Sequence, residues 1–521
     1  MNDKHAYKVN KKLLERKINY IPIRYIIAAL ISILEVVAII GGVVALCILS
    51  QWFYLGVIVA QLACVLRLMS SDGNPDYKLP WLFFILAFPV IGFMLHTIFA
   101  SRKLKRKYIK RLKALEKKTY EKDDSELFEH LKEQSPIAYS QAKMLCSSAY
   151  THLFTNTAQK YFSSGEEAFK SMLIDLENAQ RFIYLEFFII DGGKFWNSIL
   201  EILCNKVKQG VEVKVLYDDI GCMKTLPGDY YKTLNKVGIK AATFSRLKGN
   251  ANSEFNNRNH RKLLIIDGSV VYTGGINLAD EYINEVERFG HWKDTAIRLE
   301  GEACWEFTSL FVTDYGISVK KIPQTENLLY PACEQKQDNG FIIPFGDGPK
   351  PIYEREVGKG IIQSMLANAT KYAYITTPYL VIDNDICQTI EDTALRGVKV
   401  KIVVPHVPDK KIIFAMTKSY YSRLMKAGVE IYEYEPGFIH AKTYVVDDEI
   451  AMLGTINLDY RSLVHHFENG VWMYKCECIK DIKKDVEQVL SVSVKVSEQT
   501  TNLTPVKRFV RAILRIFAPL M

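Results

Sequence analysis

Paired cysteines, which would indicate a disulfide framework or a zinc site, are missing from this 521-residue chain. The ten cysteines are scattered, none form C-x-x-C, and Cys476 with Cys478 does not by itself make a zinc site. We therefore interpret the cysteines as reduced and mostly buried thiols. Reduced thiols favour a cytoplasmic location for the catalytic part of the protein.

Acidic residues are scarce in the first 118 positions, which contain 19 Lys and Arg against 6 Asp and Glu. Because the whole chain has 67 basic and 58 acidic residues, 48 and 52 remain for the rest. The formal net charge of +9 therefore belongs to the N-terminal region. Basic charge placed there favours a membrane surface as partner, and we expect no nucleic-acid partner.

Charged residues are almost absent between residues 25 and 66, where Glu35 is the one acid. At about twenty residues per span, this segment is long enough to cross a bilayer twice. Residues 79–100 form a third apolar run, which contains Pro89, a predicted kink. The first run is too long for a cleaved signal sequence and lacks a small-residue cleavage site.

The charges leave the number of membrane spans open. The N-terminus and the stretch after Ala100 are both basic, and basic flanks stay in the cytoplasm, which requires an even number of spans. Either two runs cross and one is re-entrant or interfacial, or one basic flank is translocated. We expect residues 1–120 to form a multi-pass membrane anchor with two or three transmembrane segments. The alternative is a set of buried core helices in a soluble protein.

A histidine–lysine motif occurs twice. In both copies H-x-K-x4-D is followed at the same interval by G-[GT]-x-N, which is hard to obtain by chance. The first copy has Gly275 where the second has Thr455. The two copies comprise His260, Lys262, Asp267 and Asn277, and His440, Lys442, Asp447 and Asn457.

The residue types in this motif indicate phosphate chemistry. Side chains two apart in a strand share a face, so each copy predicts an imidazole beside an ammonium group. An imidazole can attack or transfer protons, and lysine and asparagine can hold an anionic oxygen. Two facing strands would place the histidines on opposite sides of one phosphate, as an in-line displacement requires. The alternative is two unrelated buried strands with satisfied histidines.

Other polar residues have weaker predictions. We place Asp267 and Asp447 in the catalytic motif but interpret them as structural. Asp294 and Glu468 follow the histidines by 34 and 28 residues and are candidates for orienting the imidazoles, with surface carboxylates as the alternative. No metal site is predicted, because the adjacent histidines do not share a face in a strand or helix and no carboxylate lies four residues after any of the remaining histidines. The histidines considered were His291, His406, His465 and His466.

An α/β pattern repeats after the anchor. GVEVKVLYDD from Gly210 and GVKVKIVVPH from Gly397 are near copies, and each precedes one histidine motif. We predict two βαβ-rich halves that share one site, at residues 135–325 and 340–498. Residues 323–340 are polar and are expected to join them.

The C-terminal residues 505–521 predict a basic amphipathic helix. Apolar residues fall at i, i+3, i+4, i+7, i+8 and i+11 from Val506, and basic residues take the other face. Such a helix is typical of a membrane-surface element. The alternative is a terminal helix packed on its own protein.

The doubled motif resembles the signature of the phospholipase D superfamily. The stretches NNRNHRKLLIIDG, RFGHWKDTAIRLEGEA and GTINLDYRSLVHHFENGV are similar to bacterial cardiolipin synthases of the clostridial type, as are NPDYKLPWLFFILAFPVIG and the closing FAPLM. The resemblance covers almost the whole chain. It implies an α/β fold of two phospholipase D-like domains in a pseudo-twofold pair, preceded by an N-terminal transmembrane helical region.

The resemblance further implies a phosphatidyltransferase of a bacterial cell membrane that needs no cofactor. Two phosphatidylglycerol molecules would give cardiolipin and glycerol through a phosphatidyl-histidine. We assign His260 as the nucleophile and His440 as the acid and base, although the near-symmetric motifs leave this order open. Lys262, Lys442, Asn277 and Asn457 would bind the phosphate.

Several alternative functions remain open. With water as acceptor the same chemistry gives a phospholipase D hydrolase, and with another alcohol a different transphosphatidylase. Nucleases share the superfamily, but the apolar N-terminus and the slightly acidic catalytic part argue against nucleic acid. A membrane scaffold without catalysis is disfavoured because both motif copies are complete. The sequence indicates no oligomeric state.

Overall fold

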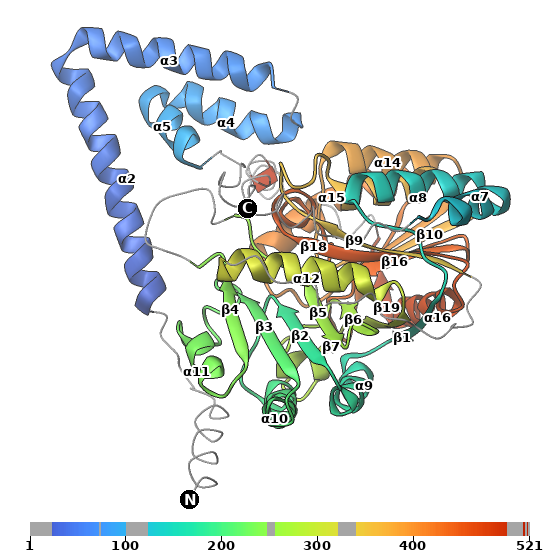
Figure 1. The fold of residues 1–521 in the computed structure, drawn as a ribbon. Coiled ribbons are helices and arrows are strands. Elements are labelled where there is room, and N and C mark those ends of the chain that lie inside the picture. Colours follow the sequence, from blue (N-terminus) through green and yellow to red (C-terminus); the bar gives the residue numbers. More distant parts are fainter. Residues whose placement is uncertain are drawn as a thin grey trace, which may run out of the picture.

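The computed structural model describes residues 23–71, 74–99, 123–246, 256–320 and 340–497, together with residues 514, 515 and 518. Two mixed α/β units lie side by side, each built on one open sheet (Figure 1). Apolar helices from the N-terminal part lie at one end of the pair.

The first sheet has seven strands in the order β1-β8-β6-β5-β2-β3-β4. Strands β2, β3 and β4 are parallel, because helices α10 (Lys194–Lys208) and α11 (Tyr230–Lys236) carry the chain back between them. Helix α9 (Gly165–Asn178) and α10 share a core with β2, which is buried at every position. The strands are β1 (Thr157–Phe162), β2 (Phe182–Phe187), β3 (Glu212–Asp218), β4 (Lys240–Phe244), β5 (Lys262–Ile266), β6 (Val270–Gly274) and β8 (Ala296–Gly301).

The second sheet repeats this order with one strand added, as β19-β13-β12-β10-β15-β16-β18-β9. Its parallel strands β10, β12 and β13 are connected by helices α14 (Asn384–Leu395) and α15 (Lys411–Lys426). The predicted internal duplication is confirmed, since both sheets are connected in the same way. The strands are β9 (Phe341–Asp347), β10 (Tyr372–Thr376), β12 (Lys399–Pro405), β13 (Glu430–Tyr434), β15 (Thr443–Val446), β16 (Ile450–Gly454), β18 (Glu468–Tyr474) and β19 (Ser493–Lys495).

One apolar core joins the two sheets. Leu263 of the first sheet and Val471 of the second belong to the same buried cluster. Helices α12 (Cys304–Val319) and α16 (Cys478–Ser491) contribute to this cluster, α12 through Phe307. Because the cluster is continuous, a residue pair contributed by both halves can be held at a defined distance.

Helices α7 (Ser125–Gln134) and α8 (Pro136–Ala149) precede the first sheet but pack on the second. Leu145 of α8 lies in the same core cluster as residues of helix α13 (Val357–Ala367). The predicted start of the first half at residue 135 stays a prediction. The packing of α8 favours a later start, near Thr157 where β1 begins.

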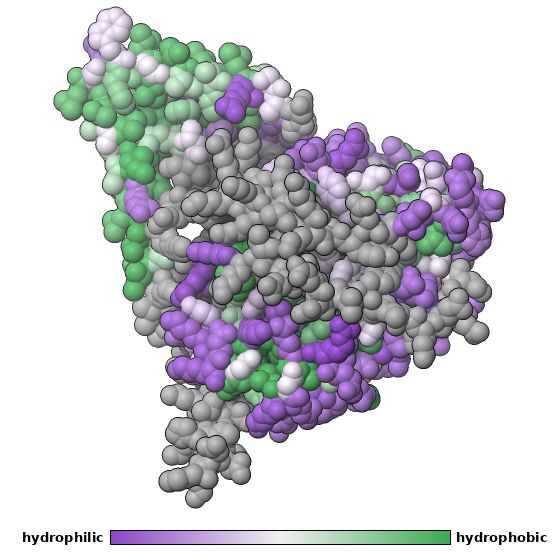
Figure 2. All heavy atoms as spheres, in the orientation of Figure 1, coloured by the Kyte–Doolittle hydropathy of each residue, from purple (hydrophilic) through white to green (hydrophobic). Residues whose placement is uncertain are grey.

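Two N-terminal helices are long and apolar enough to cross a membrane. They are α2 (Ile23–Leu49) and α3 (Gln51–Met69). Most of their large apolar side chains are exposed, and Figure 2 shows the resulting apolar surface at the upper left. Such exposure fits contact with lipid better than with water.

The third apolar run does not form one helix. Phe88 separates α4 (Pro75–Ala87) from α5 (Pro89–Phe99), so the predicted break at Pro89 is confirmed. The two helices pack closely, since a Cβ atom added at Gly92 would lie 2.0 Å from the carbonyl oxygen of Phe84. At about 1.5 Å per residue, neither helix is long enough for the roughly 30 Å of a bilayer core.

The predicted amphipathic helix at residues 505–521 lies outside the described residues except for three positions. Ala518 is 2% exposed, and Leu514 packs with it against the core of the second half. The Arg515 guanidinium lies 4.7 Å from the centre of the Tyr420 ring. These contacts favour the alternative in which the tail packs on its own protein.

Candidate active site

Each motif histidine is bonded to the opposite half of the molecule. Both lie just before their motif strands, β5 and β15, rather than within them. The backbone N–H of His260 donates to the Phe467 carbonyl at 2.8 Å, and that of His440 donates to the Lys293 carbonyl at 2.7 Å. The duplication therefore extends to the way in which the two halves are attached to each other.

Short backbone pairings extend these attachments. Strand β14 (Gly437–Ile439), which ends one residue before His440, pairs in parallel with β7 (His291–Lys293) of the first half. On the other side, Asn259 forms a parallel bridge with Phe467. Each pairing places a carboxylate, the next residue along its chain, beside the histidine of the other half.

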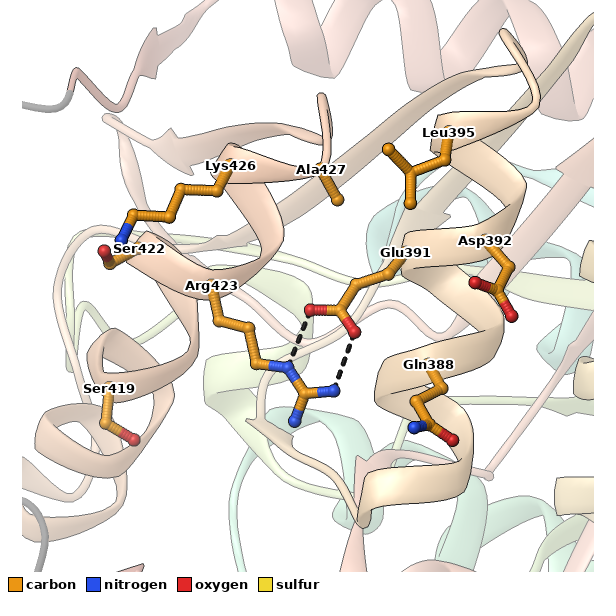
Figure 3. Close-up of a pocket in the computed structure, with 9 residues that line it drawn as sticks. All are labelled: Gln388, Glu391, Asp392, Leu395, Ser419, Ser422, Arg423, Lys426 and Ala427. Atoms are coloured by element: carbon orange, nitrogen blue, oxygen red, sulfur yellow. Dashed lines mark hydrogen bonds and ion pairs between the residues drawn. The ribbon is translucent and has the colours of Figure 1, made fainter.

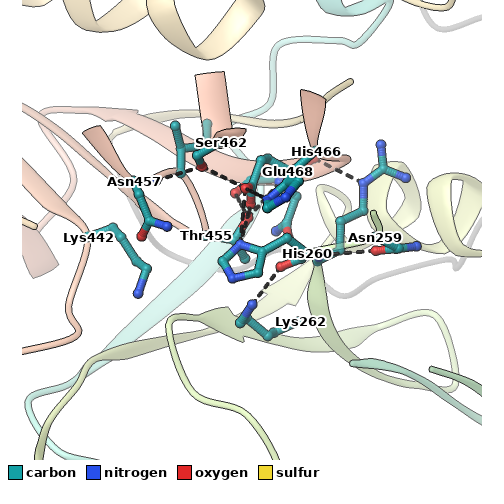
Figure 4. A network of polar contacts seen from close by, with 12 residues as sticks. Asn259, His260, Lys262, Lys442, Thr455, Asn457, Ser462, His466 and Glu468 are labelled. Carbon is teal, nitrogen blue, oxygen red and sulfur yellow. Dashed lines mark hydrogen bonds and ion pairs between the residues drawn. The ribbon is translucent and has the colours of Figure 1, made fainter. Parts of the chain in front are cut away.

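Glu468 orients His260. The His260 Nδ1 atom lies 3.0 and 2.9 Å from the two Glu468 carboxylate oxygens (Figure 4). Ser462 Oγ donates to the same carboxylate at 2.6 Å, and Thr455 Oγ1 donates to its other oxygen. A carboxylate acceptor places the imidazole proton on Nδ1, which leaves the lone pair on Nε2.

Asp294 holds His440 in the same way. The His440 Nδ1 atom lies 2.7 Å from Asp294 Oδ2, and both Asp294 and Glu468 are fully buried. The alternative of surface carboxylates is therefore wrong. The sequence associated each carboxylate with the histidine that precedes it, whereas the structure exchanges the partners between the halves.

The glycine–threonine difference between the motifs fits the two carboxylates. A Cβ atom at Gly275 would lie 2.0 Å from Asp294 Oδ1, so the shorter acid packs directly on the glycine backbone. In the second motif Thr455 uses its hydroxyl group to bind Glu468. The two halves thus meet the same requirement, a fixed carboxylate, with different residues.

The two motif lysines are almost fully buried and point into the site. Lys262 Nζ donates to the carbonyl of His260 at 2.6 Å, and Lys442 Nζ donates to the carbonyl of His440. Each ammonium group lies close enough to the other motif to affect a pKa there. Lys442 lowers the pKa of Lys262, and Lys262 lowers the pKa of His440. Each ammonium has three N–H donors, so further donors remain for an anion.

The motif asparagines differ in their contacts. Asn277 Oδ1 accepts the backbone N–H of Ile189 at 3.1 Å, and Asn277 Nδ2 donates to Tyr282 Oη at 2.6 Å. Asn457 Oδ1 is buried and forms no hydrogen bond within the described part of the chain. Asn457 Oδ1 can therefore accept a hydrogen bond from a ligand in the site of Figure 4, whereas both polar atoms of the Asn277 side chain have partners in the protein.

Burial keeps both imidazoles neutral near neutral pH. It lowers the pKa of His260 to about 3, an effect that Glu468 opposes and that Lys262 and His466 reinforce. Burial also lowers the pKa of His440 to about 4, with Lys442 acting in the same direction. A bound phosphate anion would raise both pKa values, because it favours the charged imidazolium.

Burial also weakens the proton affinity of the lysines. It lowers the pKa of Lys262 to about 7 and that of Lys442 to about 8, against the opposing effect of nearby carboxylates. Burial would raise the pKa of Glu468 and Asp294, but His260 and His440 outweigh it and hold both pKa values below their usual range. The site therefore combines two carboxylates, two neutral imidazoles and two lysines that titrate near neutral pH.

The motif aspartates lie at the other ends of their strands. Asp267 accepts the backbone N–H groups of residues 180, 181 and 182, and Asp447 accepts those of residues 370, 371 and 372, all within 2.6 to 2.8 Å. Both residues have a φ of 55° at the turn after the strand. Their contacts fix the start of β2 and β10 and do not reach the histidines.

Sequence reasoning missed two buried ion pairs that hold the first motif. Arg258 forms hydrogen bonds of 2.9 to 3.1 Å with Asp218, which also accepts the Asn259 N–H. Arg261 contacts Asp314 and donates to the Glu468 carbonyl at 3.0 Å. The run of basic residues in NNRNHRK was the available signal.

A third histidine lies beside His260. The ring centres of His466 and His260 are 5.5 Å apart, and His466 Nδ1 lies 3.6 Å from Glu468 Oε1. Within the described residues, neither ring nitrogen of His466 forms a hydrogen bond. The ligand atoms of His260, His466 and Glu468 lie within 4.8 Å of one another, which makes them the metal-binding candidate in this region.

This group is a poor fit to a metal. At bond lengths of about 2.0 to 2.2 Å, zinc ligands lie roughly 3.5 Å apart, and the Glu468 oxygens already accept hydrogen bonds from three groups, His260, Thr455 and Ser462. His291 and His406 are used elsewhere, by Tyr434 and Glu433. The absence of a metal stays a prediction.

A surface hollow of about 720 Å³ lies between α14 and α15 (Figure 3). An ion pair between Arg423 and Glu391 crosses it, with a shortest distance of 2.6 Å. None of the predicted site residues lines it. We therefore assign the chemistry to the histidine site and not to this hollow.

Comparison with known proteins agrees with the geometry. A family model described as a cardiolipin synthase, phospholipase D-like domain matches residues 172–288 and 362–490, one match in each half. A cardiolipin synthase of Halalkalibacterium halodurans is 32% identical over 459 residues, which cover 87% of this chain and 90% of that protein. The chain belongs to the cardiolipin synthase family of phospholipase D-like proteins. The family predicted from the motifs is thus confirmed, and with it an enzyme that acts on phospholipid at a membrane.

Two further relatives extend this picture. An uncharacterized protein of Streptococcus mutans is 40% identical over 466 residues, covering 88% of this chain and all of the relative. The crystal structure of a phosphatidylserine synthase of Haemophilus influenzae matches with a TM-score of 0.55 and 16% identity. It covers 73% of this chain and 98% of the synthase, and at this identity the likeness concerns the fold alone.

Proposed function

We propose that the protein transfers a phosphatidyl group from one phosphatidylglycerol to another, giving cardiolipin and glycerol. The observation that carries this proposal is the pair of buried imidazoles, each held through Nδ1 by a carboxylate of the other half. Each imidazole keeps Nε2 free for chemistry. Two such groups around one anion-binding pair of lysines suit a double displacement at phosphorus.

In the first step, His260 Nε2 attacks the phosphorus of the first lipid. The bond from phosphorus to the headgroup oxygen breaks, and protonated His440 gives its proton to that oxygen, so glycerol leaves. Glu468 balances the positive charge that develops on His260. The bound phosphodiester supplies the negative charge that raises the pKa of His440 enough for it to carry this proton.

In the second step, a terminal hydroxyl of the second phosphatidylglycerol attacks the phosphatidyl-histidine. His440 takes the hydroxyl proton while the bond from phosphorus to His260 Nε2 breaks. Cardiolipin is released, His260 is neutral again and His440 is protonated again, so the cycle closes. Lys262, Lys442 and Asn457 hold the phosphate oxygens during both steps.

The N-terminal helices support a multi-pass membrane location. We propose that α2 and α3 cross the bilayer and that the hairpin of α4 and α5 enters it without crossing, an arrangement with an even number of spans. The catalytic halves then lie in the cytoplasm with the basic flanks. Free cysteines throughout the described residues support this side of the membrane.

The first experiment identifies the products. The purified full chain is added to phosphatidylglycerol vesicles without metal, and lipids and glycerol are measured by mass spectrometry. Cardiolipin with an equal amount of glycerol is expected. Phosphatidic acid without cardiolipin would make the protein a hydrolase and overturn the transferase proposal.

A second experiment tests the order of the histidines. Wild-type protein quenched during turnover is expected to carry a phosphatidyl adduct on the His260 peptide. The His440→Ala variant lacks both the acid of the first step and the base of the second, so it is expected to form neither adduct nor product. His260→Ala is expected to form no adduct and no product. His130→Ala serves as the control, because His130 lies exposed on α7. An adduct on His440 would reverse the assignment.

A further inference from the structure

The start of the membrane hairpin is hydrogen-bonded to the second half. Asn74 Nδ2 donates to Asp383 Oδ2 at 2.8 Å. Asp76 Oδ2 accepts the backbone N–H of Asn384 at 2.9 Å and the hydroxyl of Tyr460 at 3.2 Å. The first turn of α4 thus binds two separate segments of the catalytic part.

The two segments that bind the hairpin follow the two strands of one short parallel β-ladder. Strands β11 (Leu380–Val381) and β17 (Leu458–Asp459) pair in parallel. Asp383 lies two residues after the end of β11, and Tyr460 directly follows β17. Tyr77 packs at the same place, since it is 4% exposed and its ring lies edge-on at 5.1 Å from Tyr460. The contact between the hairpin and the second half is therefore buried and includes specific ring packing.

A series of contacts connects Tyr460 to His260. Tyr460 precedes the π-helical turn η3 (Arg461–His465), a rare conformation that often occurs at functional sites. Within this turn, Ser462 Oγ accepts the Asn457 N–H at 2.8 Å and donates to Glu468 at 2.6 Å. Glu468 in turn holds the His260 imidazole.

No matching connection reaches His440 among the described residues. The Asp294 carboxylate contacts His440 and the Thr295 N–H and packs on Gly275, all in the two halves themselves. The hairpin is therefore placed to affect one histidine of the pair and not the other. This asymmetry distinguishes positioning from a general effect on stability.

We propose that Asp76 and Tyr460 are positioning residues, through which the membrane hairpin sets the orientation of the His260 imidazole. When Asp76 holds Tyr460, the π-helical turn presents Ser462 to Glu468, and Glu468 fixes Nδ1 of His260. Release of the hairpin loosens this series of hydrogen bonds and moves Nε2 of His260 out of line with the phosphorus. The kinetic part of this proposal rests on the proposed transferase function, whereas the orientation of His260 does not.

The test compares Asp76→Ala, Asp76→Asn and Tyr460→Phe in the full chain. Asp76→Ala removes both hydrogen bonds, whereas the amide oxygen of Asp76→Asn can still accept them. For Asp76→Ala and Tyr460→Phe, kcat is expected to fall about threefold to tenfold with little change in KM, and Asp76→Asn is expected to restore most of it. The double variant of Asp76→Ala with Tyr460→Phe is expected to lose no more than the worse single variant, because both remove the same contact.

A second readout needs no lipid substrate. Diethyl pyrocarbonate modifies neutral imidazole, and the modified peptides of His260 and His440 are quantified by mass spectrometry. Asp76→Ala is expected to raise the modification rate of His260 severalfold relative to that of His440. Lys78→Ala is the matched control, since Lys78 lies in the same turn and its amine binds the Ser71 carbonyl of its own segment.

The outcomes separate the possibilities. Faster modification of His260 alone supports the proposal even if the wild-type protein makes no cardiolipin, in which case the proposed function fails by itself. Equal rises at both histidines, or a higher KM with unchanged kcat, would overturn the proposal. If Asp76→Ala does not fold, Tyr460→Phe is tested in the same two measurements, because it keeps the ring packing and removes only the hydroxyl group that Asp76 binds.

Discussion

The His440 Nδ1 atom lies 2.7 Å from Asp294 Oδ2, although 146 residues of chain separate them and they belong to different halves. His260 and Glu468 form the reciprocal pair. Neither half therefore contains a motif histidine together with the carboxylate that holds it. A site of this kind exists only when the two halves are docked, so the proposed catalysis depends on the shared core.

Asp294→Asn tests this exchange. The amide keeps the size of the side chain but can donate a hydrogen bond, which favours the wrong imidazole tautomer of His440, so kcat is expected to fall by about 10²- to 10⁴-fold. Turnover is measured with phosphatidylglycerol vesicles after circular dichroism has verified the fold. Glu287→Gln is the control, since Glu287 is exposed in the loop before β7. A loss below threefold would show that the carboxylate does not act through His440.

We expect the lysines to set the alkaline side of the pH dependence of kcat/KM. Their pKa values of about 7 for Lys262 and about 8 for Lys442 belong to the free protein, and the protonated form binds the phosphate. Activity is therefore expected to be present below these values and to fall as pH rises through 7 to 8. Lys262→Arg keeps its charge at high pH and is expected to move this fall upward. A profile that still climbs beyond pH 8 would contradict the role of the lysines.

Asp447→Asn is expected to lower stability more than catalysis. The change weakens a charged acceptor of three backbone N–H groups, and the free energy of unfolding should fall by about 1.5–3 kcal/mol. Thermal unfolding and kcat are measured on the same samples, with Glu449→Gln as an exposed neighbouring control. Loss of kcat at full stability would return Asp447 to the catalytic group.

Removal of metal ions is expected to leave activity intact. The proposed double displacement uses imidazole, carboxylate and ammonium groups, none of which needs a Lewis acid. Activity is measured after dialysis against EDTA and again after each of several divalent metals is added. Loss of activity that one metal restores would refute the metal-free mechanism and point to the group of His260, His466 and Glu468.

Ala518→Asp tests the C-terminal tail. Because Ala518 packs in the core cluster of the second half, a carboxylate there is expected to lower the melting temperature and to reduce activity equally on vesicles and on detergent-dispersed lipid. Activity on both lipid forms is compared with that of Ala518→Gly. A defect confined to vesicles would favour a tail that acts on the membrane surface.

Much of the site could be predicted from the sequence, since a doubled motif at a constant interval is visible without any structure. His260 and His440 stand out because two copies of one pattern rarely arise by chance. Thr455, Ser462 and His466 do not, because they contact Glu468, whose pairing with His260 joins residues 208 positions apart in the chain. The ion pair of Arg258 and Asp218 is equally invisible, since it joins the end of β3 to a segment 40 residues further along the chain.

The fold could likewise be predicted in part from the sequence. Alternating strands and helices around GVEVKVLYDD and GVKVKIVVPH indicated two α/β halves, and the apolar runs indicated the membrane anchor. The packing of α8 against the second half follows from contacts between distant segments, whereas the division of the third apolar run at Phe88 agrees with the kink predicted at Pro89.

By itself, then, the sequence determined the kind of chemistry and the number of halves, because local patterns specify strands, motifs and membrane segments. Only the tertiary structure decided which carboxylate serves which histidine, and that Asp76 of the membrane hairpin reaches the segment before η3. The physical reason is that both relationships depend on docking between surfaces remote in the chain, where shape and buried hydrogen bonds select the partner.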